Sequence, residues 1–566
     1  MDFNTWEDYR EQIDKTGELP EDWYVLGIDL GTTNSVISYW DSSTKRPEAI
    51  DVSNGFGKIP LPSVVQFRSG CRKGELPIAE EDEWVIGEEA YRSYKLYPES
   101  TVRSIKRKMG TNEVVSLGGM DYLPEAISAK ILAELVQHCQ NLNPKAEIAG
   151  VVVGVPYDFD DAAKKATIKA CELAGFGKKL ICLIEEPKAA ALAYNFRHSL
   201  EQGEKIMVFD FGGGTLDITV FHVAEKSEAS IRVKVISEGG EAHHGGDNID
   251  ETLLEKCYTF IQSKTGQAKD EITADNQAEL IVRTREAKER LSGVKSFRIP
   301  FTFCIPPFVE NYTREQFEHL ISPFMEKTRK LVVQVLREAY DGAINPNDIN
   351  RVLLEGGSAA MPWVKQMLIG IFNDEGKIYS SEKPALDIST GAAYYAAMKM
   401  GLLDSPELVD EQLHAGVVTD RPQMMVNFET TIPHDIGFEI EKGDRKTFFA
   451  MVKRGTPYAL AKKSHVFTLA GDSAEDMTEL GIRILERMNK QDTIEKCKLI
   501  GDVKIAGLPT RPSGKTRLRV TLSVEEENGL VRGMVEDMGF GDEFVPSGYK
   551  QGFEPRRYGN TVIYNT

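Results

Sequence analysis

The sequence predicts a mixed α/β protein in which a large α/β region precedes an antiparallel β-sandwich. Up to about residue 403, apolar strand-like runs alternate with helical patterns, as in a sheet covered on both faces. One strand–turn–strand pattern occurs twice in that region. Beyond about residue 430 the helical patterns stop, and short alternating runs remain between turn residues.

Length and charge set the first limits. A chain of 566 residues is too long for one hydrophobic core, so we expect two or three domains. With 41% hydrophobic and 27% charged residues, the composition is that of an ordinary soluble globular protein. The formal net charge of -19 argues against nucleic acid or an anionic membrane as the main partner, because both attract basic surfaces.

The N-terminal residues and the cysteines indicate a cytoplasmic protein. Residues 1–22 form a polar, acidic extension without the basic and apolar segments of a secretory signal. No apolar run is long enough for a membrane-spanning helix. The seven cysteines are odd in number and contain no CxxC pair, which predicts reduced thiols rather than disulfides or a zinc site.

The repeated pattern predicts two related lobes. Both VLGIDLGTTNSVISYW and MVFDFGGGTLDITVF read as buried strand, aspartate, glycine-rich turn with threonine, and second strand. Asp29 and Asp210 hold the same place in the two copies, about one domain length apart. Each lobe would offer one hairpin to a shared cleft; the alternative is two unrelated hairpins that look alike. Further strands are expected at 24–30, 148–156 and 179–187, with helices at 161–176 and 188–196.

The later part of the chain divides into three segments. Residues 404–429 are polar and marked by prolines, which predicts a linker. Residues 430–540 hold the alternating runs of the β-sandwich. Residues 541–566 are rich in glycine and aromatic residues, and we interpret them as a tail without a long amphipathic helix.

The hairpins favour binding of a polyphosphate with magnesium. A turn without Cβ atoms lets backbone N–H groups close on an anion, and the glycines 212–214 face a second such turn at 31–33. Mg²⁺ prefers carboxylate oxygens together with water and substrate phosphates, and Asp29, Asp210 and Asp217 stand at the mouths of the turns. Singly, each acid would pass as a turn former or helix cap.

Several segments together resemble the seventy-kilodalton heat-shock (DnaK-type) chaperone family of the actin and hexokinase superfamily. The resemblance covers about nine tenths of the chain and implies an α/β actin-like two-lobed ATPase domain at residues 23–403, followed by a β-sandwich substrate-binding domain at 430–540. The matching segments are GIDLGTTNSV (27–36), STVRSIKRKMG (100–110), IEEPKAAALAY (184–194), FDFGGGTLDITV (209–220), GGDNID (245–250), VLLEGGSAAMPWVKQML (352–368) and the β-region stretch from IAGLP to EEENGL.

The resemblance implies a role for each matching residue. Asp29 and Asp210 would organise magnesium, Asp217 and Glu186 would orient the attacking water, and Lys106 would neutralise charge on the γ-phosphate. Thr32, Thr33 and Thr215 would bind phosphate oxygens. The remaining ATP-binding residues would be Gly31, Asn34, Gly212, Gly213, Gly214, Gly245, Gly246, Lys288, Ser292, Gly356, Gly357 and Ser358.

The chain departs from the family at the adenine end of the site. The family places arginines in an ERAKRxLS helix and a GGSTRIP turn, where this chain has Glu289 and Ala360. Arg285 or Arg290 would have to substitute from another turn of the helix, or nucleotide affinity would be lower. Ala385 also replaces the acid usual after a proline in the second connecting motif.

Departures continue in the linker and beyond the sandwich. The family's acidic, leucine-rich linker is replaced by 425–429, and its long helical lid has no counterpart, as in the lid-poor branch called HscC. An extended peptide would bind in a groove of the sandwich by backbone hydrogen bonds and one apolar pocket. Phe438, Phe467, Ala470 and Leu480 would line that groove, or would be ordinary core residues of a sandwich.

The family resemblance predicts an ATP-hydrolysing chaperone of client polypeptides, with a J-domain partner and a nucleotide-exchange factor. One alternative is a weakly hydrolysing, nucleotide-stabilised co-chaperone or client-binding module. Another is a small-molecule kinase or filament-forming ATPase of the same superfamily, although neither of these needs the β-sandwich.

Overall fold

The computed structural model describes residues 4–17, 19–52, 59–69, 83–227, 230–403, 425–429, 431–442, 445–469, 479–488, 492–506, 516–525, 528–538 and 556–562. The chain divides into two compact units. The first unit comprises Met1–Asp158 and Ala166–Phe428, and the second comprises Phe159–Lys165 and Glu429–Thr566.

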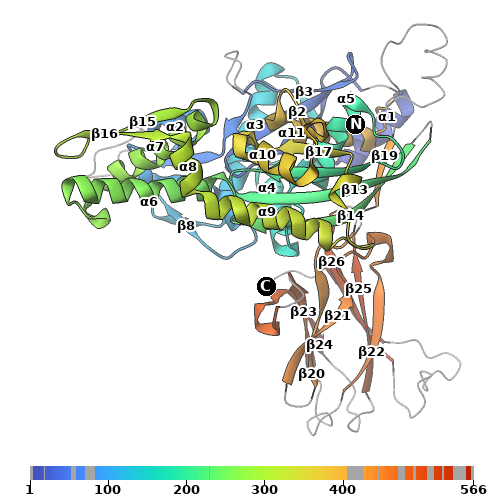
Figure 1. The fold of residues 1–566 in the computed structure, drawn as a ribbon. Helices are drawn as coiled ribbons and strands as arrows, with labels where there is room; N and C mark the ends of the chain where they lie inside the picture. The colour runs from blue at the N-terminus through green and yellow to red at the C-terminus, as the bar shows by residue number, and fades with distance from the viewer. Residues whose placement is uncertain are drawn as a thin grey trace, which may run out of the picture. The chain divides into compact units, whose positions relative to one another are not determined.

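Two six-stranded sheets of the first unit repeat one topology (Figure 1). The first sheet has the order β11-β10-β1-β2-β3 with β4 paired to β2, and the second has the order β18-β17-β12-β13-β14-β19. In each sheet the strand that carries the aspartate has one parallel and one antiparallel neighbour. Strand β1 pairs parallel with β10 and antiparallel with β2. Strand β12 pairs parallel with β17 and antiparallel with β13. The two copies of the sequence pattern therefore hold the same position in two sheets.

The strands of these two sheets have the following bounds: β1 Trp23–Asp29, β2 Asn34–Asp41, β3 Arg46–Ala49, β4 Leu61–Pro62, β10 Glu147–Val155, β11 Leu180–Glu185, β12 Lys205–Phe211, β13 Thr215–Lys226, β14 Ser230–Ala242, β17 Arg351–Glu355, β18 Ile378–Ser380 and β19 Met425–Glu429. Three small sheets accompany them: β5 Val64–Arg68 with β6 Glu83–Ile86 and β7 Thr101–Arg103, β8 Val115–Leu117 with β9 Met120–Tyr122, and β15 Ser296–Phe301 with β16 Phe308–Thr313.

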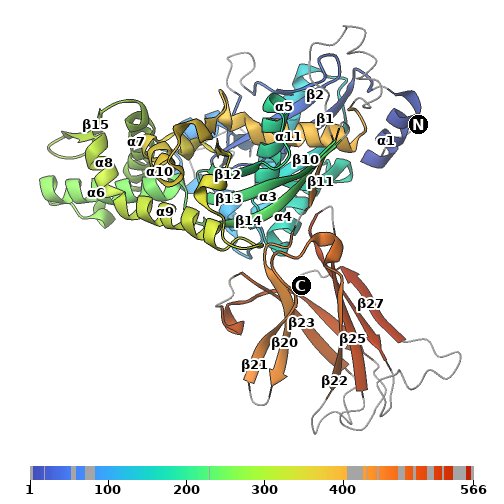
Figure 2. The ribbon, with the colours of Figure 1, turned by 45° about the vertical axis from the view of Figure 1, so that its right-hand side comes forward.

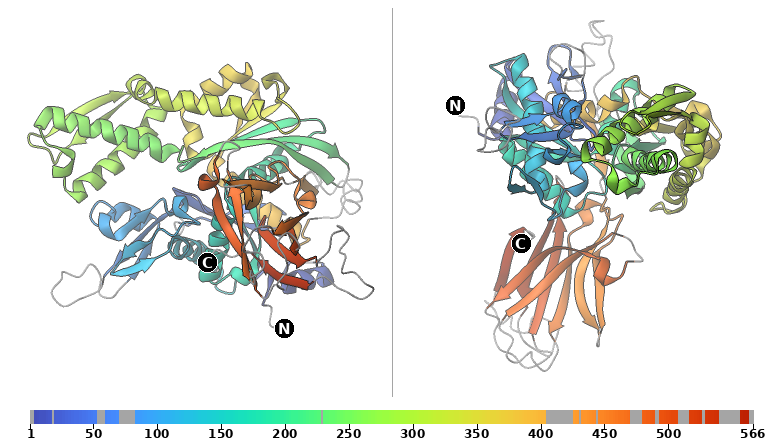
Figure 3. Two further views of the ribbon diagram at one scale, coloured as in Figure 1. Left: turned by 90° about the horizontal axis from the view of Figure 1, so that it is seen from below. Right: turned by 90° about the vertical axis from the view of Figure 1, so that its left-hand side faces the viewer.

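Helices surround both sheets, and Figure 3 shows the half with the first sheet beside the half with the second. Their bounds are α1 Trp6–Thr16, α2 Glu88–Ser93, α3 Pro124–Leu142, α4 Asp161–Leu173, α5 Glu186–His198, α6 Gly246–Thr265, α7 Ala274–Gly293, α8 Arg314–Leu320, α9 Ser322–Arg337, α10 Pro362–Phe372 and α11 Pro384–Lys399. Helices α5 and α11 pack against each other, and their residues share one core with β1 and β12.

Glycines set the closeness of that packing. A Cβ atom on Gly27 of β1 would lie 2.0 Å from the backbone nitrogen of Ala393 in α11, and a Cβ on Gly391 would lie 1.8 Å from the carbonyl oxygen of Ala189 in α5. Real Cβ atoms do not approach backbone atoms so closely, so larger residues at these positions would push α11 away from both neighbours. The close contact fixes the ends of β1 and α5, where Asp29 and Glu186 lie.

The N-terminal extension contains a helix that packs on the first unit. Helix α1 starts after Thr5, whose backbone N–H donates to the Asp8 carboxylate at 2.8 Å, and it ends at Gly17 with φ of +73°. Tyr9 and Ile13 are buried in the core shared with β1 and β10. The polar extension therefore has one apolar face and adds to the first unit.

The end of the predicted linker is a strand of the first unit. Strand β19 pairs with β14 and forms one edge of the second sheet. Val426 is buried, and the Phe428 ring lies 5.7 Å from the Phe221 ring between centroids. Residues that replace the family's leucines thus still supply apolar contacts, and the rest of the predicted linker, 404–424, lies outside the described residues.

The second unit contains two antiparallel four-stranded sheets (Figure 2). One has the order β21-β20-β23-β24 and the other β22-β25-β26-β27. The bounds are β20 Asp435–Lys442, β21 Arg445–Val452, β22 Lys463–Leu469, β23 Glu479–Arg487, β24 Lys498–Ala506, β25 Thr516–Val524, β26 Val531–Asp537 and β27 Arg556–Val562. Apolar residues from both sheets form one core.

Strand β27 was not expected, since the sequence analysis interprets 541–566 as a tail. Residues Arg556–Val562 pair antiparallel with β26, with Tyr558 opposite Val535. The segment RRYGNTV has no clear apolar alternation, so the free edge of β26, rather than local pattern, explains its strand conformation.

Within the described part of the chain, no helix is long and apolar enough to cross a membrane. The six described cysteines are free thiols, five of them buried. Cys71 lies outside the described residues.

Candidate active site

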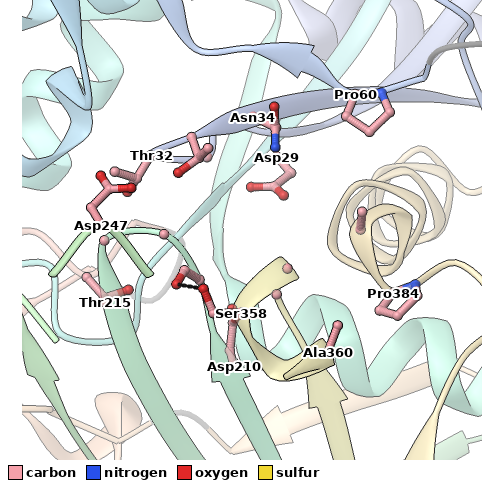
Figure 4. Close-up of a pocket in the computed structure, with 18 of the residues that line it drawn as sticks. Asp29, Thr32, Asn34, Pro60, Asp210, Thr215, Asp247, Ser358, Ala360 and Pro384 are labelled. Carbon is pink, nitrogen blue, oxygen red and sulfur yellow. Dashed lines mark hydrogen bonds between the residues drawn. The ribbon is translucent and has the colours of Figure 1, made fainter. Parts of the chain in front are cut away.

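A cavity of about 370 Å³ in the first unit collects most of the residues that the sequence singles out (Figure 4). Both glycine turns contribute to its wall, as do α7 and the turn after β17. The expected residues that line it are Asp29, Gly31, Thr32, Thr33, Asn34, Lys106, Glu186, Asp210, Gly212, Gly213, Gly214, Thr215, Lys288, Ser292, Gly356, Gly357 and Ser358.

Three expected residues contact that wall from behind. Asp217 accepts a hydrogen bond from the Thr215 hydroxyl at 2.8 Å. The backbone N–H of Gly246 donates to the Gly212 carbonyl at 3.0 Å. A Cβ on Gly245 would lie 2.4 Å from the Gly213 carbonyl oxygen. These residues shape the second glycine turn rather than the cavity surface.

The two glycine turns meet across the cavity without room for side chains. A Cβ on Gly213 would lie 1.9 Å from Thr33 Oγ1, and a Cβ on Gly214 would lie 2.5 Å from Thr32 Oγ1. Arg107 holds the second turn from outside by donating to the carbonyls of Gly213 at 3.2 Å and Gly214 at 3.1 Å. The turns therefore present backbone and threonine hydroxyls to the same space.

Four carboxylates and one ammonium group gather where the two sheets face the cavity. Asp29 ends β1 and Asp210 lies near the end of β12, opposite Asp217 of β13. Glu186 begins α5 and forms a buried ion pair with Lys106. Three acids and the base are less than a tenth exposed: Asp210 at 5%, Asp217 at 0%, Glu186 at 5% and Lys106 at 8%.

Burial changes the protonation of this group. Enclosure by protein, with Glu186 nearby, raises the pKa of Asp29 to about 7, although Lys106 opposes the shift. Burial also raises the pKa of Asp210, with Glu186 and Asp29 adding to it, and the pKa of Asp217. Burial alone would lower the pKa of Lys106, but Glu186 and Asp29 outweigh it and raise that pKa. If all four acids were ionised, they would carry more negative charge than Lys106 balances, and the raised pKa values reflect that repulsion together with burial.

Polar atoms at this place lack partners among the described residues. Thr33 Oγ1 and Asp217 Oδ1 are buried and make no hydrogen bond there. Buried oxygens without partners are costly in a folded protein. They are oxygen ligands of the kind that water, phosphate or a hard cation would satisfy.

The Lys288 ammonium group is hydrogen-bonded to other residues of the protein. It donates to the Gly246 carbonyl at 2.9 Å and to the Asp250 carboxylate at 2.8 Å. Burial raises the pKa of Asp250 to about 6, against the effect of Lys288. Ser358 donates to the Gly212 carbonyl at 2.8 Å. Lys288 therefore ties α7 to the start of α6, and Ser358 ties the turn after β17 to the second glycine turn.

Glu289 and Ala360 line the cavity at the positions of the family's two arginines. Arg285 lines it as well, one helical turn before Glu289, whereas Arg290 is exposed and is not among the described lining residues. Figure 4 shows Pro384 and Ala360 on the side of the cavity away from Thr32 and Thr215.

Sequence reasoning missed several residues of the site. Arg107 lies in a KRK run that reads as a solvated face, and Asp247, which accepts from Ser104 at 2.7 Å, lies in a motif chosen for its glycines. Glu355 ends β17 opposite Asp210, and burial raises its pKa. The signal for Glu355 was available, because an acid follows a buried strand directly before a glycine pair.

The four peptide-groove candidates do not share one setting. Phe438 is 1% exposed in the core of the second unit, and its ring meets the half-buried Phe467 ring edge to face at 5.8 Å. Leu480 lies on β23 opposite Ile505. Ala470 lies outside the described residues. For Phe438, the placement matches the alternative of an ordinary core residue.

Two adjacent glycines offer a matched test of the turn after β17. Gly356 has φ of +77°, and a Cβ there would lie 2.5 Å from the Phe211 backbone, whereas a Cβ on Gly357 meets nothing within 4 Å. We expect Gly356→Ala to destabilise the first unit by about 1–3 kcal/mol. Gly357→Ala should stay within about 0.5 kcal/mol of the wild type.

Urea unfolding followed by tryptophan fluorescence measures this difference, because Trp6, Trp23, Trp40, Trp84 and Trp363, all five tryptophans of the chain, belong to the first unit. Equal unfolding midpoints for the two variants would contradict the assigned strain at Gly356.

The raised pKa of Asp250 predicts a pH dependence of stability. Between pH 4 and 6 the unfolded state loses this proton while the folded state keeps it, so the contribution of Asp250 to stability falls as pH rises through that window. Asp250→Asn should therefore gain stability relative to the wild type from pH 4 to 6, at about 1.4 kcal/mol per pKa unit, and show no further gain above.

Unfolding at a series of pH values measures that gain, and only its slope is interpreted, because the variant also changes the contact with Lys288. A flat difference for Asp250→Asn would be evidence against the shift.

Known proteins resemble this chain over most of its length. The model of the family described as "Hsp70 protein" matches residues 25–543. The chaperone protein DnaK of Thermosipho africanus (strain TCF52B) is 31% identical over 542 residues, which is 93% of this chain and 80% of the relative. The DnaK of Mycoplasmopsis synoviae (strain 53) is 32% identical over 525 residues, covering 91% of this chain and 77% of the relative. With the motifs and the site geometry, these matches show that the chain belongs to the Hsp70 family.

Proposed function

We propose that this Hsp70-family chaperone hydrolyses ATP in an actin-like domain at residues 23–403 and binds extended apolar polypeptide segments in the β-sandwich at residues 430–540. The observation that supports the ATPase most directly is the meeting of the two glycine turns beside buried acids and Lys106 in one cavity. That combination suits a polyphosphate with its counter-cation, and we take ATP hydrolysis as the reaction because the chain belongs to the Hsp70 family.

The phosphates would lie between the two turns. Backbone N–H groups of the glycine turns, with the hydroxyls of Thr32, Thr33 and Thr215, would donate to the phosphate oxygens. The unpartnered Thr33 Oγ1 supports this, because a phosphate oxygen would accept its hydrogen bond. Lys106 would stabilise the charge that develops on the γ-phosphate, and its raised pKa keeps it protonated.

Magnesium would be held by Asp29 and Asp210. The donor set fits, since both carboxyl groups line the cavity, and a cation bound there would favour the ionised forms that burial and neighbouring acids now oppose. Among the described residues, no three His, Cys, Asp or Glu side chains form a metal site by themselves, so water and phosphate oxygens would complete the shell. When bound, magnesium would neutralise phosphate charge.

Asp217 and Glu186 would position the water that attacks the γ-phosphate. Asp217 is fixed by the Thr215 hydroxyl and has one oxygen without a partner in the described structure. Glu186 is fixed by Lys106. Both acids would accept hydrogen bonds from the water and orient it, which accords with hydrolysis controlled by positioning and electrostatics.

The second unit would hold client polypeptide, and strand β19 would connect it to the ATPase. A J-domain partner and a nucleotide-exchange factor are the partners expected for such a cycle. A second candidate is a weakly hydrolysing client-binding module, favoured by the replacement of the adenine-side arginines with Glu289 and Ala360. Single-turnover ATP hydrolysis with and without an unfolded peptide discriminates the two candidates.

Thr215→Ala should abolish most of the hydrolysis. Loss of the hydroxyl leaves Asp217 without its fixed partner and removes a phosphate contact, so the single-turnover rate should fall on the order of 10²-fold. ATP binding should change much less, because the glycine turns remain. Thr259→Ala, on the solvent side of α6, is the matched control. The catalytic assignment is wrong if the wild-type chain does not hydrolyse ATP. It is also wrong if the Thr215→Ala variant hydrolyses ATP at the wild-type rate.

The two faces of β19 allow a test of coupling. Val426 is buried and Asn427 is exposed on the same strand. Val426→Asp should free β19 and abolish stimulation of ATP hydrolysis by peptide, while the basal rate stays within about threefold. Asn427→Asp should keep the stimulation, because it adds the same charge on the solvent side. Equal stimulation in both variants would show that β19 does not transmit the signal.

A further inference from the structure

The end of the cavity opposite the glycine turns is lined in an unusual way. It is lined by the small or apolar residues Ala360, Pro384 and Ala385 and by the charged residues Arg285 and Glu289 of α7. A second cavity of about 650 Å³ adjoins this end, and the two share Arg285, Glu289, Pro384, Ala385, Asn34 and Pro60. The nucleotide cavity therefore has no tight wall at this end.

The side chain of Arg285 is held in place at this end by two contacts. Its guanidinium lies over the Tyr91 ring of α2, 5.3 Å from the centroid, and its Nε donates to Glu289 Oε1 at 3.1 Å. The side chain is only 14% exposed, compared with 61% for Glu289. A guanidinium has two flat faces, so an arginine that lies over one aromatic ring can offer its other face to a second flat, polarisable ring.

Lys288 does not compete for this role. It is held by Gly246 and Asp250, near the second glycine turn. Ser292 donates to the Lys288 carbonyl at 3.2 Å. The Glu289 carboxylate is 61% exposed and accepts hydrogen bonds only. Asn34 and Lys383 are further exposed polar residues that line the adjoining cavity.

We propose that Arg285, held by Tyr91 and Glu289, is the residue on which the nucleobase rests, and that the site accepts adenine and guanine nucleoside triphosphates with little discrimination. The proposal depends on the proposed function, since it assumes that the glycine turns hold the phosphates. Stacking on a guanidinium recognises the flat face of a purine and not its edge. Glu289 can accept from the amino group of adenine or from the N1–H and amino groups of guanine, so neither purine is rejected.

Binding of ATP, GTP, CTP and inorganic tripolyphosphate, each with Mg²⁺, to the full chain tests this proposal. Arg285→Ala should lower the affinity for ATP and for GTP by about fivefold to thirtyfold, the upper part of the range of a cation–π contact, because Arg285 is largely buried. Tripolyphosphate, which has no base, should change less than twofold. Wild-type affinities for ATP and GTP should agree within about tenfold, with CTP weaker because its ring is smaller. Arg290→Ala, an exposed arginine on the same helix, is the control and should change nothing.

The outcomes separate the possible failures. If Arg285→Ala lowers the affinity for ATP and for tripolyphosphate equally, the residue acts at the phosphates and the proposal is overturned. The proposal is also overturned if the variant binds both ligands with wild-type affinity. Preference of the wild type for ATP over GTP above a hundredfold would overturn the weak discrimination. If the wild type binds neither nucleotides nor tripolyphosphate, the proposed function fails and takes this inference with it.

Arg285→Lys provides a second measurement if Arg285→Ala does not fold. It keeps the charge and the reach to Glu289 but lacks the planar group. The proposal expects a several-fold loss of ATP and GTP affinity with tripolyphosphate unchanged. Wild-type affinity for all three ligands in this variant would show that charge alone acts there.

Discussion

Excess negative charge buried around Lys106 is the constraint on which the candidate site depends. Glu186 lies close enough to raise the pKa of Asp29 and of Asp210, and the one ammonium group opposes these shifts only in part. A fold gains nothing from burying acids in this way, because each is costly to remove from water. Their arrangement is best explained by what they hold. A divalent cation and a phosphate chain would supply positive charge and hydrogen-bond acceptors where Asp217 Oδ1 and Thr33 Oγ1 lack partners in the described structure.

The repeated sheet topology explains how two distant parts of the chain supply that group. In both sheets the aspartate stands at the carboxyl end of a strand that is parallel to one neighbour and antiparallel to the next. Each antiparallel connection is the glycine turn itself. Because the turns touch where Gly213 meets Thr33, neither half can complete the site alone. The glycines are needed for this approach rather than for flexibility.

Much of this arrangement could be predicted from the sequence, because it rests on local patterns. Buried strands, glycine turns and the acids that follow strands are visible as short motifs, and the alternating runs of the second unit correspond to β20 through β26. What could not be predicted rests on distant contacts. Strand β27 depends on an open edge, and Arg107 belongs to the site only through its hydrogen bonds to Gly213 and Gly214. The proposed choice of Arg285 over Arg290 depends on Tyr91 of another helix. The N-terminal helix also depends on distant contacts, because Tyr9 and Ile13, two apolar positions in a polar segment, are buried against other parts of the first unit.

The two ends of the cavity differ in how much change they tolerate, and the reason is physical. At the phosphate end, recognition uses backbone groups packed so closely that a Cβ at Gly213 would overlap Thr33, so few substitutions preserve the geometry. At the other end, recognition depends on side chains of one face of α7. A side chain one helical turn away, such as Arg285 relative to Glu289, lines the same cavity. A stacking contact contributes about 0.5–2 kcal/mol, whereas the interactions of a triphosphate with a cation and several donors are individually of similar size and much more numerous. Absence of the family's two arginines would therefore weaken the selection of the base more than the binding of the phosphates, so a site with Glu289 and Ala360 remains consistent with an ATPase.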